Sequence, residues 1–540
     1  MKSRADAELS DEVAKRRTFA IISHPDAGKT TLTEKLLLYS GAVETAGSVR
    51  PRRNQRHATA DWMMIEQARG ITVTSTALQF EHGDRLFNLL DTPGHHDFGE
   101  DTYRTLLAVD SAVMVIDSAK GIESRTRKLF EVCRMRRIPV FTFVNKLDQP
   151  GRNPLSLLDE IEDVLGIRAV PLNWPVGSGP SFQGVYDFGR GVLVRYLRGA
   201  SGQHIAARSE LELDSPEITN RLDEQESQDL RESIELLLAV CGRFDREEFL
   251  QGRLTPVLFG SALNNFGVDI FLHALAELAP APQPRRCDHG WIEPTDQEFS
   301  AFVFKIQANM DPLHRDSMAF LRICSGRFER DMLVHHPRLG KAIRMSRPHR
   351  LFAQGREGVD AAFPGDVVGV VNRGVFSIGD TVSTNPSVEF PSLPRFVPEH
   401  FSIIRNRNLA RDKQFRKGIQ QLEEEGAIQV FYSTEGAQRN VILASVGALQ
   451  FDVTQARLLQ EYGASTALEP LNYSCARWIA ASPAAVRKAD WPYSGILRVE
   501  DRNGRMAILF ASEWHLEYCE KHNREIKFQT TADGAENSAW

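Results

Sequence analysis

The sequence predicts an α/β domain with a doubly wound, mostly parallel sheet, followed by a β-barrel domain and an α+β domain. Residues 18–145 alternate compact apolar runs with helical patterns, which is typical of a sheet covered by helices on both faces. Residues 298–384 alternate apolar and polar side chains between glycines, as short barrel strands do. From about residue 400 to 530 helix and strand signals are mixed, which indicates a separate α+β unit.

The strands and helices of the first domain follow from its apolar periodicity. Buried parallel strands are rich in apolar residues, and compact, mostly apolar runs cover residues 18–23, 86–90, 112–116, 140–144 and 256–259. Apolar side chains at helical spacing predict helices over residues 29–39, 101–109, 123–136 and 268–278. Between them, residues 42–70 form a long polar connection rich in arginine. A connection of this length is either disordered or a functional lid.

Domain boundaries are expected where strand patterns stop and prolines gather. We expect a first domain over residues 1–280, with an insertion at about 149–254 because a strand pattern resumes only after it. Residues 279–284 are proline-rich and predict a semi-rigid linker. The barrel domain is placed at 290–388 and the α+β domain at 395–530. Residues 531–540 are expected to be a flexible tail.

Composition narrows the class of protein. A chain of 540 residues exceeds one hydrophobic core, so two to four domains are expected. The formal charge of −6 is unlike that of a nucleic-acid coat protein, so RNA contacts must come from local patches. The six cysteines form no C-x-x-C pair, which argues against a zinc site and a disulfide framework. No run is long and apolar enough for a signal peptide or a membrane span, so a cytoplasmic protein is expected.

A phosphate-binding loop is predicted between the first strand and the first helix. Backbone N–H groups of such a loop converge on phosphates in front of a helix N-terminus. Lys29 supplies a charge to the β- and γ-phosphates, and the Thr30 hydroxyl coordinates Mg²⁺. Ser23 stands where glycine or alanine is usual, and a small side chain is tolerated there. The residues predicted to bind nucleotide here are Ser23, His24, Pro25, Asp26, Ala27, Gly28, Lys29, Thr30 and Thr31.

A second box follows the apolar run at 86–90. It reads Asp91, Thr92, Pro93 and Gly94. The Asp91 carboxylate can hold Mg²⁺ through water, and the Gly94 N–H can sense the γ-phosphate. Alone, this D-x-x-G pattern usually marks only a turn.

Two further boxes select the base. Asn145, Lys146, Leu147 and Asp148 directly follow a strand, and an aspartate at the base edge accepts from the N1–H and 2-amino groups of guanine. Adenine offers neither donor, so it would leave a buried acceptor unpaired. The segment Ser261, Ala262 and Leu263 follows the strand at 256–259, as a loop does whose N–H contacts the guanine oxygen. Four boxes in this order predict a P-loop GTPase domain that binds GTP and GDP.

Two residues concern hydrolysis besides Lys29. Thr72 ends the polar connection, where a second hydroxyl for Mg²⁺ and a γ-phosphate switch are needed, although the alternation of residues 72–80 equally fits an ordinary strand residue. His95 directly follows the D-x-x-G box and can orient the attacking water. The predicted catalytic residues are therefore His95, Thr72 and Lys29, and the predicted metal ligands are Thr30, Thr72 and Asp91.

The boxes at 69–72 and 91–95 resemble those of translational GTPases such as elongation factors G and Tu. The likeness narrows to the peptide chain release factor 3 family, a class II release factor family, and covers residues 12–530. The strings that carry it are Arg16–Ser23, Glu100–Thr105, Phe304–Pro312, His314–Asp316, Gln421–Ala427 and Leu449–Val453. Two positions depart from the pattern: His96 replaces a usual glutamate, and Gln149 replaces a usual arginine after Asp148.

The resemblance implies a function in translation termination. It implies a Mg²⁺-dependent, ribosome-stimulated GTP hydrolase that promotes dissociation and recycling of class I, stop-codon-reading release factors after peptide release, without reading stop codons itself. The implied partners are ribosomal RNA and proteins and the class I factors, with no DNA or membrane, and the chain is expected to be a monomer. It ends after its third domain, whereas elongation factor G carries two more for translocation.

Other functions stay open on the residues alone. One is a translocase-like or ribosome-protection GTPase, and another is a GTP-controlled binding module whose hydrolysis is incidental. Basic residues of the third domain, between positions 405 and 417, could meet ribosomal RNA phosphates. Residues Glu423–Glu425 follow at once, so a solvated helix face is the other interpretation.

Overall fold

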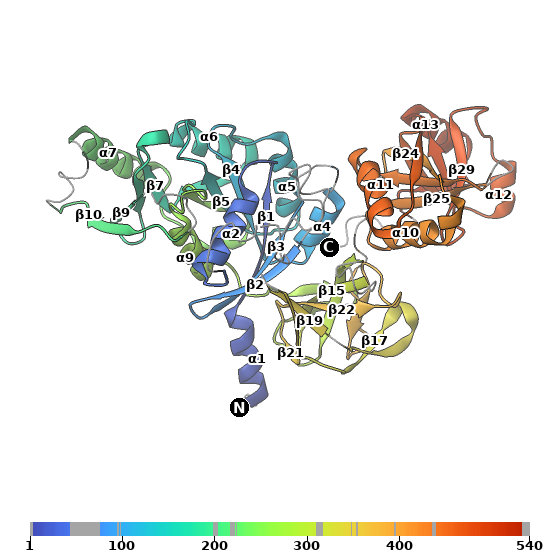
Figure 1. Cartoon of the computed structure of the whole chain (residues 1–540), viewed down its shortest axis with the longest axis horizontal. Coiled ribbons are helices and arrows are strands. Elements are labelled where there is room, and N and C mark those ends of the chain that lie inside the picture. The colour runs from blue at the N-terminus through green and yellow to red at the C-terminus, as the bar shows by residue number, and fades with distance from the viewer. Residues whose placement is uncertain are drawn as a thin grey trace.

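The first domain is built on one end of a long sheet, where the strand order is β2-β3-β1-β4-β5-β11-β6. Figure 1 shows β1 to β5 side by side in this domain. All neighbouring strands are parallel except β2 and β3, which are antiparallel. The computed structural model describes residues 4–43, 76–93, 97, 99–197, 204–215, 222, 224–308, 317–346, 348–352, 355–391, 393, 396–434 and 439–531. The strands are β1 (Arg16–Ser23), β2 (Thr76–His82), β3 (Arg85–Asp91), β4 (Ser111–Asp117), β5 (Val140–Asn145), β6 (Arg168–Pro171) and β11 (Leu254–Phe259).

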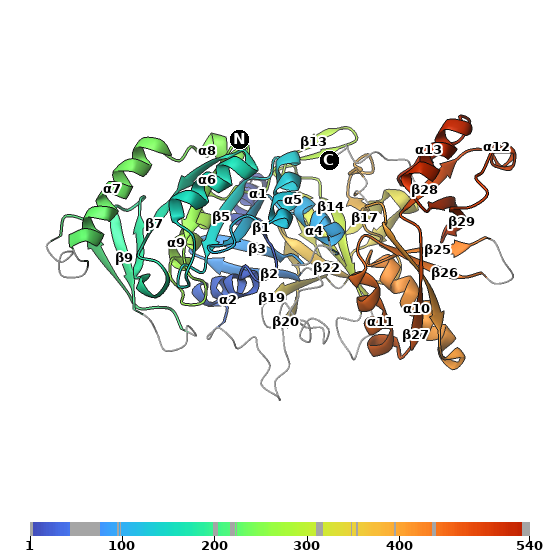
Figure 2. The same ribbon diagram turned by 90° about the horizontal axis from the view of Figure 1, so that it is seen from above.

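Helices cover both faces of this sheet, as expected for a doubly wound fold. Figure 2 shows α2 and α5 on opposite sides of the central strands. On one side α2 packs against α9, and on the other α5 packs against α4 and α6. The helices are α1 (Arg4–Lys15), α2 (Lys29–Tyr39), α4 (Gly99–Leu107), α5 (Ser124–Met135), α6 (Pro154–Leu165) and α9 (Val268–Leu278). The bounds predicted for α2 and α9 agree with the structure.

The central sheet extends into the segment that we predicted to be an insertion. β6 pairs in parallel with β11, with Val170 opposite Pro256. Asn153 caps α6, because its side chain accepts a hydrogen bond from the Leu155 N–H at 2.8 Å. Residues 154–171 of the predicted insertion therefore pack with the central sheet, and a four-residue strand such as β6 leaves little periodic signal in the sequence.

The rest of that segment forms a small unit beside the sheet. It holds an antiparallel sheet in the order β10-β9-β8-β7 and two helices. Its elements are β7 (Asn173–Val176), β8 (Gly184–Asp187), β9 (Val192–Tyr196), β10 (Arg208–Glu212), α7 (Glu224–Val240) and α8 (Arg246–Leu250).

The second domain is the predicted small β-barrel around its own apolar core. Its longest strands, β14 and β15, are antiparallel, and β15 also pairs with β22. A single residue pair between β19 and β2 continues the first sheet into the barrel. Before the barrel, β12 (Arg285–Cys287) and β13 (Gly290–Ile292) pair as a separate two-stranded sheet. The barrel strands are β14 (Ser300–Gln307), β15 (Ser317–Ser325), β16 (Phe328–Glu329), β17 (Leu333–His336), β18 (Lys341–Arg344), β19 (Pro348–Phe352), β20 (Gly355–Gly358), β21 (Ala361–Ala362), β22 (Val367–Asn372) and β23 (Thr381–Ser383).

The third domain is α+β, as predicted, with an eight-stranded antiparallel sheet in the order β27-β24-β26-β25-β29-β30-β28-β31. α10 and α11 share one apolar core, and α13 packs on another. The strands are β24 (His400–Asn406), β25 (Gln429–Ser433), β26 (Val441–Ser445), β27 (Thr466–Leu471), β28 (Cys475–Ala480), β29 (Ile496–Asp501), β30 (Met506–Phe510) and β31 (Lys527–Gln529). The helices are α10 (Asp412–Glu424), α11 (Leu449–Tyr462), α12 (Pro483–Lys488) and α13 (Glu513–His522).

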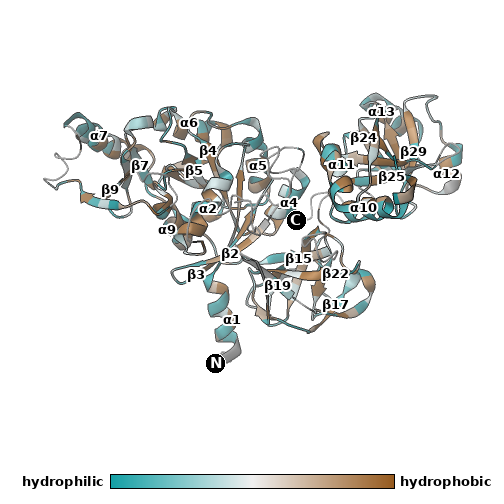
Figure 3. Cartoon of the chain, in the orientation of Figure 1, coloured by the Kyte–Doolittle hydropathy of each residue, from teal (hydrophilic) through white to brown (hydrophobic). Residues whose placement is uncertain are grey.

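Hydropathy follows these layers. Figure 3 shows that the sheet strands are mostly apolar and that the covering helices carry polar residues, as burial of apolar side chains requires. Among the described helices, none is both long and apolar enough to cross a membrane.

Buried charges join the first domain to the barrel. The Arg322 guanidinium, almost fully buried, donates to Asp110 Oδ2 at 2.5 Å and to Thr18 Oγ1 at 2.6 Å. Arg16 Nε lies 2.9 Å from Asp366 Oδ1. Such charges are tolerated in an interior only when paired, so these contacts set how the two domains meet.

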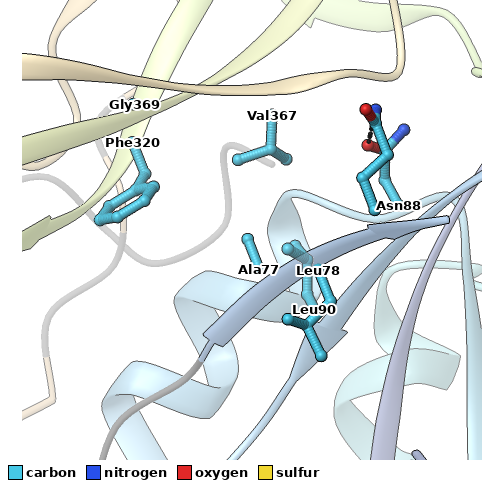
Figure 4. Close-up of a pocket in the computed structure, with 8 residues that line it drawn as sticks. Ala77, Leu78, Asn88, Leu90, Phe320, Val367 and Gly369 are labelled. Carbon is cyan, nitrogen blue, oxygen red and sulfur yellow. Dashed lines mark hydrogen bonds between the residues drawn. The ribbon is translucent and has the colours of Figure 1, made fainter. Parts of the chain in front are cut away.

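A small hollow lies at the same interface. Figure 4 shows Leu78 and Leu90 of the first domain facing Phe320 and Val367 of the barrel. The Gln79 amide donates to Asn88 Oδ1 at 2.8 Å at its rim. Both apolar and polar side chains line the hollow, which belongs to the packing between the domains.

The third domain contacts both of the others. Asp97 Oδ2 accepts a hydrogen bond of 2.6 Å from the Leu449 N–H at the start of α11. Glu425 accepts one of 2.6 Å from the Ala308 N–H of the barrel. Asp97, which makes the first of these contacts, lies only a few residues after the D-x-x-G box.

Candidate guanine-nucleotide site

The four predicted boxes lie at one edge of the central sheet. Each follows the carboxyl end of a strand: β1, β3, β5 and β11. Because these strands are parallel, their carboxyl ends share an edge, which is where open α/β sheets bind ligands. The structure therefore brings together the loops at 23–31, 91–93, 145–148 and 261–263.

Gly28 gives the phosphate loop its close turn into α2. Its φ of +96° is a conformation that side chains rarely adopt, and an added Cβ would lie 2.2 Å from Asn145 Nδ2. Lys29 is the first residue of α2, and the Gly28 carbonyl accepts from the Leu32 N–H at 2.9 Å. The N–H groups of a first helical turn have no partner within the helix, so this turn is suited to an anion.

Lys29 and Asp91 form a buried ion pair at the centre of the site. Lys29 Nζ lies 2.6 Å from Asp91 Oδ1, and both side chains are buried. Thr92 fixes the adjacent loop, because its Oγ1 donates to the Ile21 carbonyl at 2.6 Å. The residue predicted for the β- and γ-phosphates thus contacts the residue predicted for Mg²⁺.

Asn145 connects the phosphate loop to the loop at 261–263. Its Nδ2 donates to the Ala27 carbonyl at 2.8 Å, and its Oδ1 accepts from the Ala262 N–H at 2.9 Å. All three residues are buried. A buried polar group that loses its partner costs about 1–3 kcal/mol, so this side chain holds two nucleotide loops in a set relation.

Replacing Asn145 with alanine is expected to destabilise the first domain by about 2–4 kcal/mol, because the Ala27 carbonyl and the Ala262 N–H would both lose their partner. GDP affinity should fall at least about tenfold, since the phosphate loop and the loop at 261–263 would no longer be held in a fixed position relative to each other. Thermal unfolding and GDP titration measure the two effects. Asn264→Ala in the same loop is the control, because the Asn264 side chain donates to the neighbouring Ser261 Oγ at 3.3 Å and does not link the two loops in the described part of the chain. Equal behaviour of the two variants would contradict the prediction.

Asp148 carries an acceptor suited to guanine. Its Oδ1 is buried and has no hydrogen-bond partner in the described part of the chain. A buried carboxylate oxygen without a donor is costly, and the N1–H and 2-amino groups of guanine would supply donors. Ser261 and Ala262 are buried, whereas the Leu263 side chain is 57% exposed, so a backbone contact fits that loop best.

Lys146 is held beside the base loop by an acid that the sequence analysis did not single out. Lys146 Nζ lies 2.8 Å from Asp117 Oδ2. Burial raises the pKa of Asp117, but the hydrogen bonds from Lys146 and from the Ala119 N–H lower it overall. Asp117 directly follows the apolar run 112–116, as Asp91 follows the run 86–90, so the same signal could have found it.

The remaining phosphate-loop residues differ in burial. Ser23 and His24 are buried and Asp26 is exposed, while Pro25, Thr30 and Thr31 are half-buried. His24 Nε2 lies 3.4 Å from Glu123 Oε2, and burial lowers the pKa of His24. Three predicted residues, Thr72, Gly94 and His95, lie outside the described residues, as does the segment 44–70.

Comparisons with known proteins agree with this architecture. The family described as the elongation factor Tu GTP binding domain matches residues 14–281, elongation factor G domain 2 matches 298–385, and the C-terminal domain of the class II release factor RF3 matches 390–520. A solved structure from Thermus thermophilus superposes with a TM-score of 0.67 at 23% identity, covering 87% of this chain and 71% of that one, which shows a shared fold.

Curated relatives match nearly the whole chain. Peptide chain release factor 3 of Rippkaea orientalis is 52% identical over 532 residues, 98% of each chain. The protein of the same name from Gloeobacter violaceus is 54% identical over 525 residues, 97% of this chain and 99% of the relative. The Nostoc punctiforme relative is 52% identical over 98% of each chain. This chain therefore belongs to the peptide chain release factor 3 family of translational GTPases, which bind guanine nucleotides.

Proposed function

We propose that this chain hydrolyses GTP on the ribosome and thereby promotes dissociation and recycling of class I release factors after peptide release. It reads no stop codon itself. The observation that carries the proposal is full-length identity above 50% to proteins named peptide chain release factor 3, joined to a site whose loops suit GTP. We further propose a monomer in the cytoplasm whose partners are ribosomal RNA and proteins and the bound class I factor.

In this site the phosphate loop would hold the phosphates and the loops at 145–148 and 261–263 the base. Thr30, Thr72 and Asp91 would hold Mg²⁺, because hydroxyl and carboxylate oxygens are the ligands this hard cation prefers. The buried Asp91 carboxylate lies beside Lys29. The carboxylate suits a divalent cation, and the lysine suits a phosphate. When bound, Mg²⁺ would supply charge neutralisation for the phosphates. Lys29 would bind the phosphates, and His95 would orient the attacking water.

The division into domains at 1–280, 290–388 and 395–530 is part of the proposal. Separate apolar cores in the barrel and the third domain support it. Of the basic residues of the third domain, Arg405 pairs with Glu469 and Arg416 with Asp412. Paired arginines on the surface contribute little to stability, and they stay available to RNA phosphates.

The proposal is tested on ribosomes that carry a class I factor after peptide release. GTP hydrolysis by the chain should rise strongly when these ribosomes are added, and the labelled class I factor should dissociate faster with GTP than with GDP. If the rate of GTP hydrolysis does not change when ribosomes are added, the chain would instead be a GTP-controlled binding module. Movement of tRNA without loss of the class I factor would favour a translocase-like GTPase.

The same assay separates binding from chemistry at His95. His95→Ala should leave GTP affinity within a factor of about three, while ribosome-stimulated hydrolysis falls roughly 10²-fold, because a positioned catalytic group is lost. His96→Ala is the matched control and should change hydrolysis much less. If His96→Ala is the impaired variant and His95→Ala turns over normally, the catalytic role belongs to the other histidine.

A further inference from the structure

The loop at 261–263 is closed by the residues that follow it. The Ser261 N–H donates to the Phe266 carbonyl at 2.9 Å, and the Phe266 N–H donates to the Ser261 carbonyl at 3.0 Å. Asn265 lies inside this closure with a φ of +65°, a left-handed conformation that asparagine and aspartate adopt more readily than most residues. A displacement of Asn265 or Phe266 therefore displaces the loop that is proposed to contact the guanine oxygen.

This closed loop is held by the small unit of β7, β8, β9, β10, α7 and α8, which we call the inserted unit. Asn265 Nδ2 donates to the carbonyl of His204, between β9 and β10, at 2.6 Å. Tyr196 of β9 stacks on Phe266, with ring centroids 5.0 Å apart and an interplanar angle of 15°. Both residues that close the loop thus contact the inserted unit through their side chains.

The Tyr196 hydroxyl fixes the chain on the other side of Phe266. It donates to Asp269 Oδ1, in the first turn of α9, at 2.6 Å. Burial raises the pKa of Tyr196, so the hydroxyl stays protonated and keeps its donor. Arg208 of β10 also pairs with Asp269. The inserted unit therefore holds the chain both before and after Phe266.

The inserted unit also contacts the other base box. The N–H of Gly179, between β7 and β8, donates to the Leu147 carbonyl at 2.8 Å. The Leu147 N–H in turn donates to the Gly260 carbonyl at 3.2 Å, which joins the box at 145–148 to the residue before the loop at 261–263. Both segments assigned to the base thus rest on the inserted unit.

We propose that Asn265 and Tyr196 are positioning residues through which the inserted unit holds the loop at 261–263 against guanine and slows nucleotide release. This role rests on the proposed GTP site and adds to it a determinant of nucleotide exchange outside the four boxes. The loop must move away from the base before a nucleotide leaves, and the contacts with the inserted unit oppose that movement. Differences of affinity between related complexes lie mostly in the dissociation rate. GDP and GTP carry the same base, so the release of both is slowed by the same factor.

The test measures how fast the full-length chain releases GDP with a fluorescent group on its ribose after unlabelled GDP is added in excess. Asn265→Asp removes the amide donor and sets a carboxylate oxygen against the His204 carbonyl. Release of GDP, and of a GTP analogue with an imido bridge between the β- and γ-phosphates, should both become about tenfold faster, with association rates within about twofold of wild type. The control Asn264→Asp adds the same charge one residue away, where the side chain donates to Ser261 Oγ, and it should leave both release rates within about twofold.

A base analogue separates positioning from a loss of stability. The diphosphate of 2-aminopurine riboside lacks the 6-oxygen that the loop at 261–263 is assigned to contact. Its affinity, measured by displacement of labelled GDP, should therefore differ by less than about twofold between wild type and Asn265→Asp, because the contact is absent in both cases. Equal weakening of this analogue and of GDP would assign Asn265 to the stability of the domain and would overturn the proposal.

A second variant keeps the test valid if the first fails to fold. Tyr196→Phe removes the hydroxyl that donates to Asp269 and keeps the stacked ring, so release of both nucleotides should become about threefold faster. Tyr186→Phe is its matched control and should change neither rate, because Tyr186 lies on the neighbouring strand β8 and packs on Phe188.

Two results contradict the role of the inserted unit while leaving the proposed function intact. One is release at the wild-type rate in a folded variant of either positioning residue. The other is faster release of only one of the two nucleotides, which would place the effect at the phosphates and not at the base. Wild-type chain that binds neither nucleotide overturns the proposed function itself, which is a different outcome.

Discussion

Replacing Lys29 with alanine should lower GTP turnover by several orders of magnitude. In phosphoryl transfer nearly all catalysis comes from positioning and charge stabilisation, and Lys29 is the buried cation at the start of α2. The variant also leaves the buried Asp91 carboxylate without its 2.6 Å partner. Breaking a buried pair in this way costs about 3–5 kcal/mol, so some loss of thermal stability should accompany the loss of turnover.

Two measurements keep these effects apart. Single-turnover hydrolysis is measured on protein that thermal unfolding shows to be folded, and GDP affinity is measured on the same sample. Lys35→Ala is the matched control, because Lys35 is another buried lysine of α2 outside the phosphate loop. Near-normal hydrolysis in folded Lys29→Ala would place the phosphate loop elsewhere in the chain.

Replacing Asp148 with asparagine should exchange the base specificity. In the proposed site the Asp148 carboxylate would accept two donors of guanine, and hydrogen bonds to a charged group contribute about 1.5–3 kcal/mol each. GTP affinity should therefore fall about 10²- to 10⁴-fold. Xanthosine triphosphate should bind better than GTP, because the 2-carbonyl of xanthine then meets an amide donor. Competition between the two nucleotides for the same site measures the exchange.

The control for this variant is Asp163→Asn, which removes an exposed carboxylate from α6. It should leave both affinities within about twofold. Asp148→Asn with unchanged GTP affinity would contradict the assignment of residues 145–148 to the base. It would also contradict the interpretation of the Asp148 Oδ1 atom, which has no partner among the described residues.

The sequence by itself determined the strands that carry the site and the order of its loops. β1, β3, β5 and β11 each contain a compact, mostly apolar run, and each is followed by one of the four boxes. Parallel strands place their carboxyl ends at one edge, so the meeting of the four boxes follows from local patterns alone. The α2 and α9 helices were predicted with the bounds that the structure shows, because their apolar spacing is regular.

Only the tertiary structure decided which distant groups touch. Several contacts join residues that lie far apart in the chain. They are the hydrogen bonds from Asn145 to Ala27 and Ala262, the Lys29–Asp91 ion pair and the contact of Arg125 with Pro93. A sequence pattern reports the periodic burial of neighbouring residues, whereas such contacts depend on how whole elements pack. The same holds for β6, whose four residues became a sheet strand only through pairing with β11. Local periodicity thus set the framework, and close packing in the folded chain set the distances within the site.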